Sequence, residues 1–65
     1  MKRNASGWFV WTVCEYNDAG DLTRVTTVKT DTANKQAAEG AYLHDMARHC
    51  ADGYKAPASY SIAAE

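Results

Sequence analysis

The fold is decided by residues 8–20, which read Trp-Phe-Val-Trp-Thr-Val-Cys-Glu-Tyr-Asn-Asp-Ala-Gly. Aromatic and β-branched residues dominate from Trp8 to Tyr16, and such residues favour a strand. Residues 17–20 have the composition of a hairpin turn, in which Gly20 can take the positive φ of a bulge. The sequence therefore predicts a β-hairpin whose second, more polar strand runs from Leu22 to Lys29.

The turn also predicts the register of this hairpin. If Asn17 faces Asp21, Tyr16 pairs with Leu22, and the two-residue period of a strand fixes the other pairs. One face would then carry the pairs Tyr16–Leu22, Cys14–Arg24, Thr12–Thr26 and Val10–Val28, and the other Glu15–Thr23, Val13–Val25, Trp11–Thr27 and Phe9–Lys29.

A helix is expected after the hairpin. Thr30-Asp31-Thr32 is an entry signal, because a short side-chain oxygen can accept from the first-turn N–H groups. The helix should run from about Thr32 to Ala51, with Asp52-Gly53 closing it. Helical periodicity gathers mainly small side chains on the side that would face the sheet. This predicted buried stripe consists of Ala33, Gly40, Leu43, Ala47, Cys50 and Ala51, with Met46 and His44 at its margins.

The end of the chain predicts a third strand, from Ala58 to Ala63, with Tyr60 and Ile62 on one side. Pro57 cannot continue a helix and biases the residue before it toward extended geometry. The first strand is the most hydrophobic and should be central. The predicted fold class is α+β, with ββαβ order, an antiparallel sheet of strand order 2-1-3 and one helix on one face. Order 1-2-3 is the alternative.

Length and composition limit the function. A chain of 65 residues forms one small core with a stability of roughly 3 to 10 kcal/mol, which leaves little for a strained catalytic pocket. We expect residues 1–7 to be a flexible lead-in to a single domain, residues 8–65.

The net charge is −1, and apart from Lys2 and Arg3 the basic residues are scattered, so direct nucleic-acid binding is not expected. No segment has the length of a signal peptide or membrane span, which predicts a complete, cytoplasmic protein.

No pattern indicates catalysis, a cofactor or a metal site. The spacing of His44, His49, Cys14 and Cys50 matches no zinc motif, and adjacent helical residues diverge by about 100°. Cys50 falls near the centre of the predicted buried stripe, which indicates an inert thiol. The acidic loop at residues 17–21 is explained by a hairpin turn and lacks the ligand spacing of a calcium site.

The number of aromatic residues is the feature that points to a function. The chain has seven of them, more than one short helix with a small-residue face can cover. The sequence does not show which sheet face the helix covers; if it covers Phe9, Trp11 and Val13, the face left open carries Trp8, Val10, Thr12, Cys14, Tyr16, Leu22 and Val28. A contiguous exposed apolar patch of this kind marks an interface, unless the terminal segments fold over it. With Arg24 at the edge of this face and an acidic loop beside it, the predicted partner-binding residues are Trp8, Val10, Tyr16, Leu22, Arg24, Asp18 and Asp21.

In size and general style the chain resembles the short accessory proteins of bacteriophages and other mobile elements, including anti-CRISPR proteins, although no motif carries the resemblance. It implies a non-enzymatic protein-binding module that inhibits a host enzyme or a nucleic-acid-handling complex. The alternatives are a nucleic-acid-binding accessory domain that stacks bases on Trp8 and Tyr16, and a minimal enzyme or metal protein. Self-association into a homodimer and binding of a foreign protein both remain open.

Overall fold

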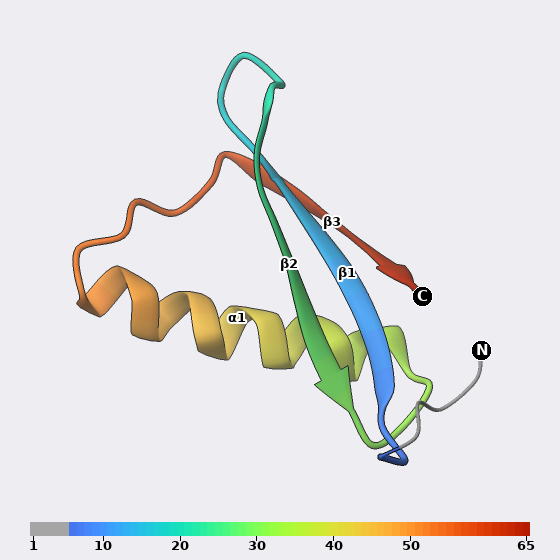
Figure 1. The fold of residues 1–65 in the computed structure, drawn as a ribbon. Coiled ribbons are helices and arrows are strands. Elements are labelled where there is room, and N and C mark those ends of the chain that lie inside the picture. The colour runs from blue at the N-terminus through green and yellow to red at the C-terminus, as the bar shows by residue number, and fades with distance from the viewer. Residues whose placement is uncertain (1–5) are drawn as a thin grey trace.

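The computed structural model describes residues 6–65, which form strands β1 (Phe9–Tyr16) and β2 (Leu22–Thr30), helix α1 (Lys35–Ala51) and strand β3 (Ser59–Ala64). The sheet is antiparallel with the order β2-β1-β3, and α1 lies across one of its faces (Figure 1). The predicted ββαβ fold and strand order are confirmed. Residues 1–5 of the predicted lead-in lie outside the described residues.

The turn between β1 and β2 forms as its residue types predict. The side chain of Asn17 accepts hydrogen bonds from the N–H groups of Ala19 at 3.0 Å and Asp21 at 2.9 Å. The Asn17 carbonyl accepts from Gly20, whose φ is 84°. Because only glycine takes this conformation without strain, the local sequence fixes the turn.

The register of β1 against β2 differs from the prediction beyond the first pair. Tyr16 faces Leu22 as expected, but a bulge between Glu15 and Tyr16 shifts every later pair by one residue. The extra residue of β2 is Thr23, whose hydroxyl donates to the Glu15 carbonyl at 3.2 Å. A one-residue shift moves each side chain to the other face. Contrary to prediction, Arg24, Thr26 and Val28 therefore belong to the helix side of β2, and Val25, Thr27 and Lys29 to the open side.

The helix begins later than predicted and ends where predicted. Its N-cap is Asn34, whose side chain accepts from the N–H of Gln36 at 2.9 Å. Thr30, in the predicted cap region, does not cap the helix. Its hydroxyl accepts from the Trp11 indole N–H at 2.8 Å and donates to the Thr32 carbonyl. At the other end Gly53 has a φ of 97° after Ala51 and the C-cap residue.

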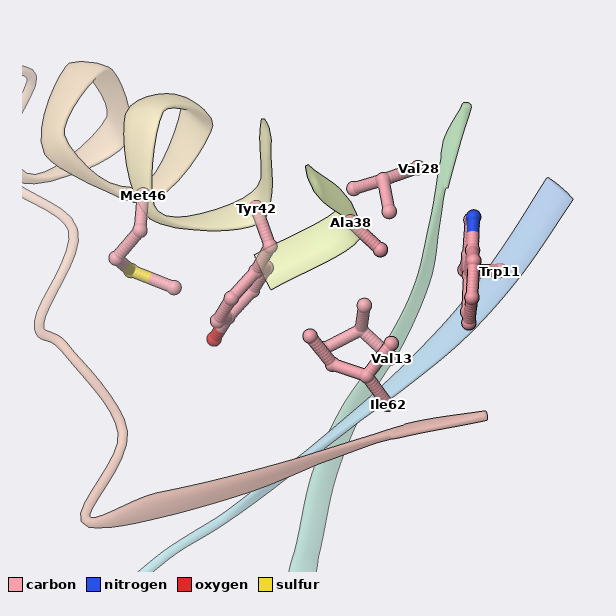
Figure 2. Packing of buried hydrophobic residues seen from close by; sticks show 7 residues of the cluster. All are labelled: Trp11, Val13, Val28, Ala38, Tyr42, Met46 and Ile62. Atoms are coloured by element: carbon pink, nitrogen blue, oxygen red, sulfur yellow. The ribbon is translucent and has the colours of Figure 1, made fainter. Parts of the chain in front are cut away.

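The buried side of α1 also differs from the prediction. The helix buries Ala38, Tyr42 and Met46, whereas Leu43 is 45% exposed and the predicted small-residue stripe faces solvent. The reason is volume, because the large side chains of Tyr42 and Met46, four residues apart, fill the space between helix and sheet that small side chains would leave empty. Figure 2 shows the resulting core, formed by Trp11, Val13, Val28, Ala38, Tyr42, Met46 and Ile62.

Candidate functional site

A buried carboxylate lies at the turn end of β1. Glu15 has the same strand parity as the core residues Trp11 and Val13, and its side chain is fully buried. Burying an ionised carboxylate without partners costs several kcal/mol. The buried Glu15 carboxylate therefore needs hydrogen-bond donors from other elements of the fold.

Four hydrogen bonds from three side chains satisfy this carboxylate. Arg24 of β2 donates from Nε to Oε1 at 2.8 Å and from Nη2 to Oε2 at 3.2 Å. Tyr42 of α1 donates its hydroxyl to Oε2 at 2.5 Å, and Tyr54, after the helix, donates to Oε1 at 2.7 Å. Each oxygen thus accepts two hydrogen bonds. We call Glu15, Arg24, Tyr42 and Tyr54 the Glu15 cluster.

The surroundings of the Glu15 cluster stabilise an ionised carboxylate and neutral tyrosine hydroxyls. Burial raises the pKa of Glu15, but the hydrogen bonds from Arg24, Tyr42 and Tyr54 outweigh burial and hold the pKa below its ordinary value of 4.5. Burial, together with the hydrogen bond to Glu15, raises the pKa of Tyr42 well above its ordinary value. At neutral pH the carboxylate is therefore ionised and both tyrosines are neutral donors. Through the fully buried Glu15 carboxylate, these hydrogen bonds connect β1, β2, α1 and the segment after the helix.

A pocket of about 370 Å³ adjoins the cluster at the hairpin end of the sheet. The Arg24 guanidinium lies 5.1 Å from the ring centroid of Tyr54, and its side chain remains 31% exposed toward this side. Three predicted partner-binding residues, Tyr16, Asp18 and Arg24, meet here. The full lining is Tyr16, Asn17, Asp18, Thr23, Arg24, Tyr54, Lys55, Ala56, Pro57 and Ala58.

The sheet face opposite α1 is the second candidate site, and we call it the open face. Its central residues on β1 are half-buried, and beside them on β2 Leu22 is 57% and Val25 56% exposed. Among the strand residues that the register places on this face, only Lys29 is charged. These residues are Val10, Thr12, Cys14, Tyr16, Leu22, Val25, Thr27, Lys29, Ser59, Ser61 and Ala63.

The predicted partner-binding residues lie on different parts of the fold. Val10, Tyr16 and Leu22 lie on the open face as predicted, but Arg24 is directed to the opposite side by its pairing with Glu15. Asp18 and Asp21 are exposed in the hairpin loop. Trp8 is 44% exposed just before β1, eight residues and roughly 26 Å along the chain from Tyr16. The predicted residues therefore do not form one compact patch.

Sequence reasoning missed the Glu15 cluster and Val25. A signal for Glu15 was present, since a glutamate at the inward parity of a hydrophobic strand needs a buried cation or several donors. Arg24 on the neighbouring strand is such a cation, but only the bulge brings it opposite Glu15. Val25 was missed for the same reason, because without the bulge it belongs to the covered face.

The cysteines and histidines do not form a site together. Cys14 is half-buried on the open face and Cys50 is exposed, so the prediction that Cys50 lies in the buried stripe is wrong. Within residues 6–65 no three His, Cys, Asp or Glu side chains come close enough to hold a metal ion. In the same part of the chain no helix is long and apolar enough to cross a membrane.

Comparison with known proteins adds no functional information, because the chain matches no family model, no curated protein and no solved structure. The function therefore has to be argued from the two candidate sites.

Proposed function

We propose that this chain is a non-enzymatic protein-binding module that engages its partner through the open face. The observation that carries the proposal is the exposure of Leu22 and Val25, each more than half exposed, beside Tyr16 on a nearly uncharged sheet face. A contiguous apolar surface of this kind on a small protein marks an interaction site. The rim of Thr and Ser side chains supplies the hydrogen-bonding groups that protein interfaces use at their edges.

The charges on this face favour a protein over a nucleic acid. A nucleic-acid surface needs several cations to neutralise phosphates, and Lys29 is the single cation among the strand residues of the open face. Arg24 lies on the other side of the sheet, bonded to Glu15. Trp8 and Tyr16 are too far apart along β1 to stack neighbouring bases.

The Glu15 cluster favours a binding function over catalysis. A general acid or base must reach a substrate proton, whereas both Glu15 oxygens are buried and already accept two hydrogen bonds each. Our proposal assigns the cluster a structural role and leaves the open face for recognition. The biological role we propose is inhibition of a cytoplasmic host enzyme or nucleic-acid-handling defence complex, as the resemblance to phage accessory proteins implies.

The test is capture from a host lysate with immobilised chain, followed by titration of the captured protein. Leu22→Glu with Val25→Glu places two charges in the centre of the proposed interface. Leu43→Glu is the matched control, since Leu43 is also exposed but lies on the outer side of α1. If these residues are hot spots, the double variant should bind at least about thirtyfold more weakly, and Leu43→Glu should bind like the wild type.

Tyr16→Ala sharpens the same test. Because Tyr16 lies on the open face and also lines the pocket, its loss should weaken binding by about 2 kcal/mol. Circular dichroism should show intact secondary structure in every variant. Equal binding by the wild type, the double variant and Tyr16→Ala would overturn the proposed function.

A further inference from the structure

The two edges of the sheet are protected to different degrees. β2 carries Arg24 and Lys29, and charged residues on an edge strand oppose pairing with another chain. β3 reads Ser-Tyr-Ser-Ile-Ala-Ala from Ser59 to Ala64 and has no charge, no proline and no bulge against β1. Figure 1 shows β3 at the outer edge of the sheet. Within residues 6–65 no other strand pairs with it.

The register shows which backbone groups of β3 face outward. Glu65 donates its N–H to the Val10 carbonyl, and hydrogen-bonded pairs alternate along an antiparallel ladder. With the observed pairing, Ser61 turns its peptide groups toward Cys14 of β1. The peptide groups of Tyr60 and Ile62 are therefore directed to the outer edge, where they can bond to another strand. Helix α1 contacts the face of β3 that carries Tyr60, where Tyr42 packs against the Tyr60 ring, and it makes less contact with β3 than with β2.

We infer that β3 pairs with β3 of a second copy of this chain, antiparallel about a two-fold axis at Ser61. In this register Tyr60 of each copy faces Ile62 of the other, an aromatic and β-branched pair of the kind that stabilises cross-strand contacts. Ser61 faces Ser61, and Ser59 faces Ala63. No like charges oppose one another, so the strand is complementary to itself, as a two-fold interface requires.

Dimerisation would also double the area of the open face. With strands about 4.8 Å apart and about 3.4 Å per residue along the eight residues of β1, one open face covers on the order of 400 Å². A standard protein interface takes about 800 Å² from each partner. Pairing two β3 strands makes one continuous six-stranded sheet, with both helices on one side and both open faces on the other. This use of the dimer rests on the proposed function, whereas the pairing itself does not.

Sedimentation equilibrium of the pure chain from micromolar to millimolar concentration tests the pairing. The wild type should pass from monomer to dimer. Ser61→Lys places like charges opposite each other at the axis and should weaken dimerisation by roughly tenfold or more. Thr27→Lys is the matched control, because Thr27 is exposed on the same face of the other edge strand. It should dimerise like the wild type.

A cross-link gives a second readout that tests the register. Ser61→Cys, made with Cys14→Ala and Cys50→Ser, should form a disulfide-linked dimer on mild oxidation, because directly opposed residues bring their Cβ atoms to about 4.5–5.5 Å. Thr27→Cys in the same background should not. A wild type that stays monomeric throughout, or dimerisation unaffected by Ser61→Lys, overturns the inference. Since no partner is present, this result is separate from the outcome of the capture experiment.

Discussion

The two faces of the sheet use their side chains in opposite ways. The covered face holds the most polar group of the core, Glu15, and satisfies it with four hydrogen bonds from Arg24, Tyr42 and Tyr54. The open face has almost no charge, yet it leaves Leu22 and Val25 exposed. A buried carboxylate on one face and two exposed apolar side chains on the other are each the reverse of the usual distribution. From this difference we propose that the covered face maintains the fold and that the open face serves for recognition.

The largest effect should come from removing the carboxylate of the covered face. Glu15→Ala leaves the Arg24 guanidinium and the hydroxyls of Tyr42 and Tyr54 without their common acceptor. Breaking such a buried pair costs about 3–5 kcal/mol, a large part of the stability of a domain this small. Urea denaturation followed by tryptophan fluorescence measures the change. A loss below about 1 kcal/mol would show that the cluster does not hold the fold together.

A smaller loss of stability should distinguish substitutions on the buried side of α1 from those on its exposed side. Ala38 is fully buried, so Ala38→Leu overpacks the core and should destabilise the fold by about 1–3 kcal/mol. Ala47 is exposed, and Ala47→Leu should change the unfolding free energy by no more than about 0.5 kcal/mol. The same denaturation assay applies to both. The reverse order of effects would restore the predicted small-residue stripe as the buried side.

The pH dependence of stability tests the cluster without a large structural change. The pKa of Glu15 is lowered, so as pH falls below 4.5 the unfolded chain binds a proton that the folded chain does not, and stability falls. The pKa of Tyr42 is raised, so above pH 10.0 only the unfolded chain releases its proton, and stability falls again. Each proton contributes a slope of up to about 1.4 kcal/mol per pH unit.

Tyr42→Phe provides the control for the alkaline limb. It removes the titrating hydroxyl, so the decline in stability above pH 10.0 should become shallower than in the wild type. An unchanged alkaline slope would mean that Tyr42 is not held neutral by burial and by Glu15.

How far the sequence predicts this structure depends on whether a feature is local. The turn at Asn17 and the helix end at Gly53 follow from their own residue types, and both were predicted correctly. The strand order followed from the hydrophobicity of β1. These features need no knowledge of what packs against them.

The errors have a common tertiary cause. Turn chemistry fixes Tyr16 opposite Leu22, but the bulge that follows is favoured by pairing Glu15 with Arg24 and by placing Val28 in the core. The helix facing is likewise decided by Tyr42, which bonds to Glu15 and packs against Tyr60 with ring centroids 4.7 Å apart. Because the Glu15 cluster joins residues far apart in sequence, neither the periodicity of one strand nor that of one helix reveals it.

The most direct test of recognition by the open face is methyl NMR of the chain with and without the captured protein. The methyl signals of Val10, Leu22 and Val25 report on the open face, and those of Val13, Met46 and Ile62 on the covered core. We predict that the first group shifts or broadens on binding while the second stays in place. Changes confined to the core methyls, or to Leu43 on the outer side of α1, would contradict recognition through the open face.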